Sequence, residues 1–218
     1  MDEEGCGRSW GNLPVPPDPL HRSADADKRL RRWLDALLVT PGLTAIDEPA
    51  EAWRVHVQDS LRGVPLVERF AGSIVDVGSG GGAPGVPLAL ALPDREVTLL
   101  EANGRRCAFL DSLALPNVRV VHGRAEEHEV DSYGVAVAKA LAPPPVAAEW
   151  CLPLVRPGGG VVLWVGPTTE PDCVARAAER LAAELEDAPR GFLVLRKLGP
   201  TPHGFPRRTG VARKRPLA

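Results

Sequence analysis

Short apolar runs alternate with segments of helical period from Gly72 onward, and this alternation constrains the fold more than any other feature of the sequence. Each apolar run predicts a strand, and each stretch whose apolar residues recur every three or four positions predicts a helix. Such alternation is typical of a parallel sheet with helices on both faces. We expect strands at 74–77, 97–101, 118–121, 135–138, 160–165 and 192–197, and helices at 84–92, 104–113, 145–155 and 170–185.

Three other segments surround this region. Residues 1–24 are rich in Gly and Pro without an apolar period, which predicts a disordered arm. Apolar residues at helical spacing predict helices at 25–38 and 49–61. The expected organisation is therefore an arm (1–24), a small N-terminal helical cap (25–71), a core (72–200) and a basic C-terminal tail (201–218), whose chain beyond Pro200 is also a candidate edge strand.

The charges are distributed unevenly along the chain. The 26 Lys and Arg against 28 Asp and Glu give a net charge of -2, which argues against a protein covered in positive charge. Residues 190–218, however, contain eight Lys or Arg and no Asp or Glu. A basic C-terminal segment on an acidic body indicates a local contact with a polyanion.

Location and metal content are predicted from what the sequence lacks. No run approaches the roughly 18 apolar residues of a membrane span, and the acidic start of the chain does not resemble a signal peptide. We therefore expect a cytoplasmic protein that does not bind membranes. The four cysteines lack the spacing of a zinc site, so we expect no metal.

The segment 74–85 is a buried strand that runs into a glycine-rich turn and then a helix. Glycines in such a turn let the backbone approach a ligand closely. The spacing of Gly80, Gly82 and Gly85 fits a dinucleotide fingerprint, whereas Asp76 with Gly78, Gly80 and Gly82 fits the loop that binds S-adenosylmethionine. The glycine spacing alone does not choose between these ligands.

Acidic residues at successive strand ends favour S-adenosylmethionine over NAD. Asp76 ends the first strand, where it would orient the cationic end of the cofactor through water or the loop backbone. Glu101 ends the second strand, where a carboxylate can accept both ribose hydroxyls, and Ala125 and Glu126 follow the third, where the adenine edge would lie. A solvated charge at a strand end is the alternative for Glu101 alone.

Four motifs make the chain resemble a known family, the bacterial 16S ribosomal RNA guanine-N7 methyltransferases, also called glucose-inhibited division protein B. The resemblance implies an α/β fold of the class I S-adenosylmethionine-dependent methyltransferases: Rossmann-like, with a mostly parallel seven-stranded sheet. The motifs are Leu43 to Ile46 followed by His56 to Leu61, Asp76 to Leu88, Arg124 to Glu127, and Phe205 to Gly210 with Pro216-Leu217.

The resemblance also implies which residues line the site. Gly78, Ala83, Ala125 and Glu126 would contact the cofactor, together with Ser79, Gly80 and Gly82 of the loop. The sequence departs from the family pattern at Gly42, where the family has asparagine, and at Lys139, where it has arginine. A small-molecule or peptide methyltransferase, or a non-catalytic cofactor-binding module, remains an alternative.

The expected reaction needs little acid–base chemistry, because guanine N7 has a free lone pair at neutral pH. We expect Lys139 to hold a phosphate or the guanine O6, and His56 and Asp59 to project from one helix face toward the sheet. A solvated lysine and a surface polar pair are the alternatives. The tail would lie along the phosphate backbone of ribosomal RNA or the small ribosomal subunit, with the protein as a monomer. Its expected phosphate contacts are Arg207, Arg208, Arg213, Lys214 and Arg215.

Overall fold

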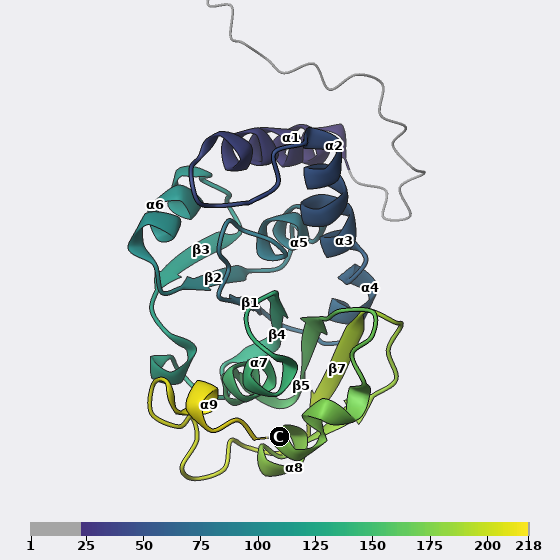
Figure 1. Cartoon of the computed structure of the whole chain (residues 1–218), viewed down its shortest axis with the longest axis vertical. Helices are drawn as coiled ribbons and strands as arrows, with labels where there is room; N and C mark the ends of the chain where they lie inside the picture. The colour runs from purple at the N-terminus through teal and green to yellow at the C-terminus, as the bar shows by residue number, and fades with distance from the viewer. Residues whose placement is uncertain (1–22, 218) are drawn as a thin grey trace, which may run out of the picture.

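The computed structural model describes residues 23–217, in which seven strands form one sheet of order β3-β2-β1-β4-β5-β7-β6 (Figure 1). Strands β1 to β5 pair in parallel, and β7 pairs antiparallel with both β5 and β6. The predicted class I methyltransferase fold is thus confirmed. The strands are β1 (Ile74–Val77), β2 (Val97–Glu101), β3 (Val118–His122), β4 (Tyr133–Lys139), β5 (Val155–Trp164), β6 (Ala183–Glu186) and β7 (Phe192–Lys197).

Alternate residues of the central strands point into two separate hydrophobic cores. In β4, Val135 and Val137 pack into one core, whereas Ala136 and Ala138 pack into the other. Successive side chains of a strand face opposite sides of the sheet, so a strand covered on both faces is mainly apolar on both. This is why these strands are short, mainly apolar runs in the sequence.

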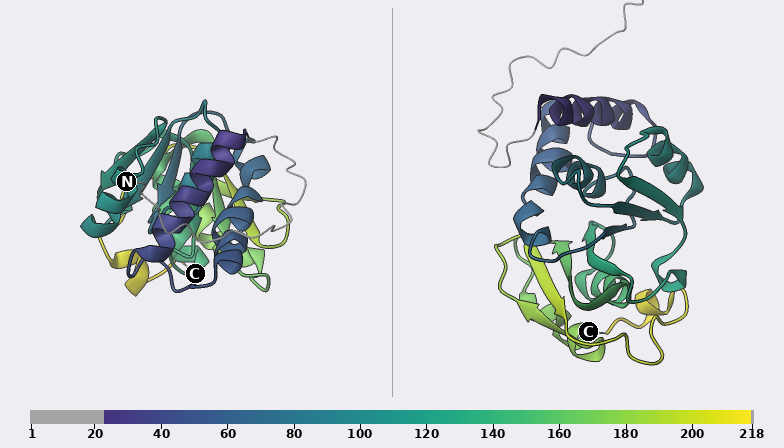
Figure 2. Two further views of the ribbon diagram at one scale, coloured as in Figure 1. Left: turned by 90° about the horizontal axis from the view of Figure 1, so that it is seen from above. Right: turned by 180° about the vertical axis from the view of Figure 1, so that it is seen from behind.

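Helices cover both faces of the sheet (Figures 1 and 2). One core contains residues of the N-terminal cap and of the helices after β1 and β2, and the other contains residues of the helices after β4 and β5. The first group is α1 (Ala24–Val39), α2 (Pro49–Ala52), the π-helix η1 (Trp53–Gln58), α3 (Asp59–Leu61), α4 (Val64–Val67), α5 (Gly85–Ala91) and α6 (Gly104–Ser112). The second group is α7 (Pro144–Cys151), η3 (Leu152–Leu154), η4 (Pro171–Val174), α8 (Ala175–Arg180) and, in the tail, α9 (Val211–Lys214).

The first helix begins at a capped N-terminus. The Ser23 hydroxyl accepts a hydrogen bond from the Ala26 amide at 3.1 Å, which satisfies one of the free N–H groups of the first turn. The predicted disordered arm, 1–24, otherwise lies outside the described residues. Among the helices of the described chain, none has the length and hydropathy that a membrane span requires.

Two predictions about the C-terminal third were wrong. The helix expected at 170–185 is shorter, because residues 183–186 form the edge strand β6, which pairs with β7. The tail forms a loop and the short helix α9 instead of an edge strand. Ala183 to Glu186 have good helix propensity, and the pairing with β7 overrides it.

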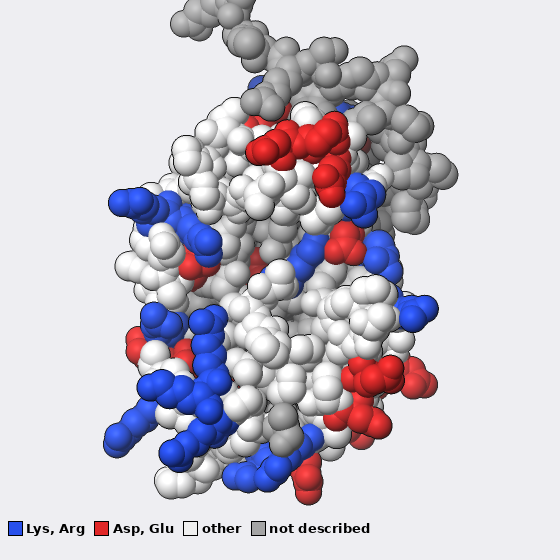
Figure 3. Space-filling model, viewed as in Figure 1, with Lys and Arg blue, Asp and Glu red and all other residues white. Residues whose placement is uncertain are grey.

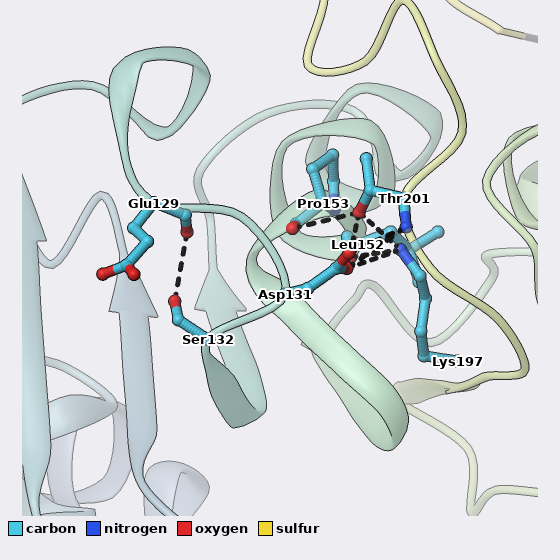
Figure 4. Close-up of polar contacts among 7 residues, drawn as sticks. All are labelled: Glu129, Asp131, Ser132, Leu152, Pro153, Lys197 and Thr201. Carbon is cyan, nitrogen blue, oxygen red and sulfur yellow. Dashed lines mark hydrogen bonds and ion pairs between the residues drawn. The ribbon is translucent and has the colours of Figure 1, made fainter.

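A buried lysine joins the end of β7 to the start of the tail (Figure 4). Lys197 is completely buried, and its ammonium group donates to the Leu152 carbonyl at 2.9 Å and to the Thr201 hydroxyl at 3.0 Å. Asp131 accepts the Thr201 hydroxyl at 2.7 Å, and its carboxylate oxygen lies 3.7 Å from the Lys197 nitrogen. Burial lowers the pKa of Lys197, and the charge of Asp131 opposes that shift. Lys197 therefore belongs to the fold and not to the basic surface of the C-terminal segment.

Candidate active site

Two adjoining cavities lie at the carboxyl ends of β1 and β4, where the strand order reverses. Open α/β sheets bind their ligands at such a switch point. The first, here called the β2 cavity, has a volume of about 280 Å³ and is bordered by Glu101, Ala125 and Glu126. The second, here called the cap cavity, has a volume of about 290 Å³ and is bordered by His56 and Lys139. Both cavities are lined by Gly78, Arg106 and Ala140.

The glycine loop forms the floor between the two cavities. Gly78 and Gly80 have φ angles of +70° and +57°, which side chains disfavour. A Cβ atom added at Gly80 would have no protein atom closer than 3.9 Å, so this backbone faces open space. The cap holds the loop from the other side, because the Trp33 indole donates to the Gly81 carbonyl at 2.9 Å. Ser79, Gly80 and Ala83 line the cap cavity as well.

Gly82 borders neither cavity and instead packs inside the protein. A Cβ atom there would lie 2.7 Å from the Val86 side chain and 3.1 Å from the Trp33 indole nitrogen. Its amide donates to the Ser79 carbonyl at 2.7 Å, which closes the turn. Its place in the structure is therefore that of a packing glycine, in contrast to the predicted cofactor contact.

Asp76 lies beneath the loop and also borders neither cavity. Its carboxylate accepts the Gly85 amide at the start of α5 at 3.0 Å, and its other oxygen has no partner within the described chain. Burial raises its pKa to about 7, against the lowering effect of the Gly85 hydrogen bond. Asp76 can therefore act on the cofactor, as predicted, only through the backbone of the loop that it supports.

Asp76 is expected to make the protein less stable as the pH rises. The carboxyl has a pKa of about 7 in the folded protein and an ordinary pKa of 3.8, so its stabilising contribution is complete below about pH 3.8 and is lost as the pH rises through 7. Between pH 5 and pH 8, the unfolding free energy of the parent should fall by roughly 2 to 3 kcal/mol more than that of Asp76→Asn. Urea denaturation at the two pH values measures this difference, and equal changes for both proteins would contradict it.

Glu101 ends β2 with a carboxylate that is only 6% exposed. One oxygen accepts the Gly80 amide and the other accepts the Asn103 amide, each at 2.8 Å. Each carboxylate oxygen has a second lone pair, so both still accept a hydrogen bond from a ligand in the β2 cavity. The ligand contact of Glu101 stays a prediction, whereas its contact with the glycine loop had no signal in the sequence.

Lys139 brings the end of β4 into contact with the cap. Its ammonium group lies 2.8 Å from a carboxylate oxygen of Asp59 and also donates to the Val55 carbonyl of the π-helix η1. Asp59 in addition accepts from Arg62 at 3.0 Å. A solvated strand-end lysine is therefore not what the structure contains, because this side chain is 13% exposed and held by two acceptors.

His56 faces the same cavity and is held in place by Thr44. The two side chains share a hydrogen bond of 2.9 Å, between the His56 Nε2 and the Thr44 hydroxyl. Burial lowers the pKa of His56, and the positive charge of Lys139 lowers it further. His56 is therefore a neutral imidazole at pH 7. It lines the cap cavity, whereas Asp59 stands behind Lys139 and does not.

The tail lies against the turn η2 (Ala125–Glu127) at the rim of the β2 cavity. Glu126 accepts the Gly210 amide at 3.2 Å, and Glu127 accepts the Thr209 hydroxyl at 2.8 Å. Gly210 and Arg213 border the cavity together with Glu126. The Arg213 guanidinium lies 5.2 Å from the centre of the Trp150 ring, in cation–π contact.

The five predicted phosphate contacts of the tail divide into two groups. Arg207 forms a bidentate ion pair with Glu149, which is 2% exposed, and also donates to the Arg215 carbonyl at 2.8 Å. A buried carboxylate requires such a partner, so Arg207 anchors the tail and the prediction of a free phosphate contact is corrected. The exposed residues are Arg208, Arg213, Lys214 and Arg215.

Three more residues belong to the site, and of these Arg106 and Ala140 were not predicted. Arg106 lines both cavities from α6, Trp150 lines the β2 cavity from α7, and Ala140 adopts a left-handed φ of +53° directly after Lys139. The asparagine cap of α6 at Asn103 was the only local signal, since it places Arg106 in the first turn beyond β2. Within residues 23–217, no group of His, Cys, Asp and Glu is arranged to hold a metal ion.

Comparison with known proteins identifies the family of the chain. The family model described as "rRNA small subunit methyltransferase G" matches residues 28–189. The chain belongs to this family. A ribosomal RNA small subunit methyltransferase G of Synechococcus elongatus is 39% identical over 80% of this chain and 82% of its own length. The protein of the same name from Chloroflexus aggregans is 35% identical over 87% of this chain and 89% of its own.

Solved structures agree with the fold. A 16S rRNA N2 methyltransferase of T. thermophilus, solved with AdoMet and guanosine, has a TM-score of 0.51 and 16% identity, covering 68% of this chain and 41% of that chain. This likeness supports the class I fold of the methyltransferase.

The residues present in the site fit the cofactor of this family. S-adenosylmethionine is the cofactor of this methyltransferase. The β2 cavity offers the Glu101 carboxylate for a ribose, and Gly80, whose backbone faces open space, borders the adjoining cap cavity. The cap cavity adjoins it through Gly78, as a methyl donor and its acceptor require. A nicotinamide cofactor, the alternative that the glycine spacing left open, has no support in the family match.

Proposed function

We propose that this methyltransferase transfers a methyl group to N7 of a guanine in 16S ribosomal RNA. The observation on which the proposal rests is the Lys139 ammonium, held at the edge of the cap cavity by Asp59 and the Val55 carbonyl. Relatives at 34–39% identity are named for the small-subunit ribosomal RNA. Together these features favour an RNA guanine as the acceptor.

The chemistry of guanine N7 suits a site without a strong base. Bound S-adenosylmethionine supplies an electrophilic methyl group on a sulfonium. N7 needs no deprotonation, so the protein has to align the base and stabilise its developing positive charge through neighbouring groups. Guanine presents O6 and N7 as adjacent acceptors on one edge. The Lys139 ammonium has three N–H donors, and two of them serve Asp59 and Val55, so the third is available for O6.

His56 and Asp59 take supporting parts in this proposal. Neutral His56, bonded to Thr44, offers a polar and uncharged wall beside the base. Asp59 positions the Lys139 cation and balances its charge. Neither residue has to remove a proton, because guanine N7 accepts the methyl group without deprotonation.

A basic surface next to the site favours a large polyanionic substrate. Lys and Arg gather beside α6 and over α9, on the side of the molecule that Figure 3 shows at the left. Such a surface binds phosphates without reading base sequence. Ribosomal RNA or the small ribosomal subunit is the proposed partner of a monomeric enzyme. This surface, here called the basic rim, consists of Arg105, Arg106, Arg124, Arg208, Arg213, Lys214 and Arg215.

Mass spectrometry of small-subunit ribosomal RNA tests the proposal. RNA digests from cells without the gene should lack one 7-methylguanosine that is present in the parent and returns when the gene is restored. Restoration with a Lys139→Met variant should fail. Identical digests with and without the gene would contradict an RNA substrate and favour the small-molecule or peptide alternative.

A further inference from the structure

We propose that the C-terminal segment 207–217, here called the clasp, forms the outer wall of the cofactor site and couples RNA contact to cofactor affinity. The cofactor part of this inference rests on the β2 cavity, and the RNA part rests on the proposed function. The tail was expected to serve RNA alone. Its contacts place one side of the segment on the cavity and leave the other side to solvent.

The clasp is attached to the protein at defined points. Arg207 pairs with the buried Glu149 of α7, and the amide of Gly210 and the hydroxyl of Thr209 reach the two glutamates of η2. Ala212 and Leu217 are 2% and 8% exposed and pack into the core that contains α7. Figure 2 shows from behind that this yellow segment runs beside α7. These contacts fix the clasp in register against the turn that borders the adenine end of the cavity.

Two neighbouring cations of α9 have different surroundings. Arg213 borders the β2 cavity and lies over Trp150, which borders the same cavity. Lys214 is also exposed but is not part of the cavity wall. Arg213 therefore belongs to the cofactor site, whereas Lys214 belongs to the surface. This pair is a matched comparison within one turn of helix.

The outward side of the clasp offers a route for coupling. Arg208, Lys214 and Arg215 are exposed on the same segment whose inner side closes the cavity. Phosphates bound to these cations would hold the clasp against η2 and so retain the cofactor. Linkage is reciprocal, so the cofactor must then raise RNA affinity by the same factor.

Calorimetry with S-adenosylhomocysteine tests the wall without RNA. Arg213→Gln should raise the dissociation constant about 3- to 10-fold, Arg213→Lys should have a smaller effect, and Lys214→Gln should change it less than about twofold. Unfolding midpoints of the three variants should equal that of the parent, which separates a local contact from a folding defect. Equal dissociation constants for Arg213→Gln and Lys214→Gln would overturn the proposal that the clasp forms a wall of the cofactor site.

The same titration in the presence of a 30-nucleotide mixed-sequence RNA tests the coupling. Saturating RNA should lower the dissociation constant of S-adenosylhomocysteine for the parent at least about threefold, and should not do so when Arg208, Lys214 and Arg215 are all Gln. If the dissociation constant of S-adenosylhomocysteine is unchanged with RNA bound, the coupling of RNA contact to cofactor affinity is overturned, but the wall is not. Absence of RNA binding would overturn the RNA contact of the clasp, whereas the 7-methylguanosine measurement decides the proposed function separately.

Discussion

Replacing Lys139 by methionine is expected to lower kcat for RNA methylation about 100- to 1000-fold, while the dissociation constant of the cofactor changes less than about threefold. Methionine keeps the apolar stem of the side chain and removes the charge. The charge is held at the cap cavity by Asp59 and the Val55 carbonyl, so its position is defined before any substrate binds. A preorganised cation of this kind acts mainly on the transition state.

Two further variants separate the cation from its support. Lys139→Arg introduces the residue that the family resemblance assigns to this position, and it should retain activity within about tenfold. Asp59→Asn keeps an acceptor but removes the balancing charge, so it should raise KM for RNA more than it lowers kcat. Methyl transfer from radiolabelled cofactor to small-subunit RNA measures all three. A Lys139→Met enzyme with the parent kcat would refute the proposed role.

Replacing Glu101 by glutamine is expected to weaken cofactor binding about 10- to 150-fold, which corresponds to roughly 1.5 to 3 kcal/mol. Both carboxylate oxygens accept a backbone amide at 2.8 Å, one from Gly80 and one from Asn103. Glutamine replaces one of these acceptors with an NH₂ group, which leaves an amide of the loop or of the α6 cap without its partner. The same change removes an acceptor for the ribose hydroxyls.

Glu96→Gln is the matched control, because Glu96 is exposed just before the opposite end of the same strand. It should bind S-adenosylhomocysteine as the parent does. Calorimetry gives both dissociation constants, and urea denaturation shows how much of the Glu101→Gln effect comes from the loop. If both variants bind equally well, Glu101 is a strand-end charge without a part in binding.

The core of the fold was predictable because its causes are local. Strands β1, β2 and β7 have the predicted bounds, since each is a short, mainly apolar segment that is covered on both faces. The glycine-rich turn after β1 was also predictable, because the positive φ angles at Gly78 and Gly80 favour glycine at these positions. The sequence did not show, however, that the carboxylates of Asp76 and Glu101 accept backbone amides of this region.

Errors arose where a distant segment decides the outcome. Residues 183–186 have a helical composition but pair with β7, and this edge strand owes its conformation to hydrogen bonds with residues about ten positions away. The division of the tail cations depends on Glu149, which lies 58 residues before Arg207 in the sequence. No pattern near Arg207 in the sequence indicates that this arginine pairs with a buried carboxylate.

The sequence by itself determined the parallel sheet, the glycine turn after β1, the acidic residue that ends β2 and the family to which the chain belongs. The tertiary structure alone decided that Lys139 meets Asp59 of the cap, that Asp76 lies beneath the loop, and that Gly210 and Arg213 of the clasp border the β2 cavity. The reason is physical. Periodicity and turn chemistry act between near neighbours, whereas ion pairs, burial and cavity walls join residues whose separation in sequence carries no information about their distance in space.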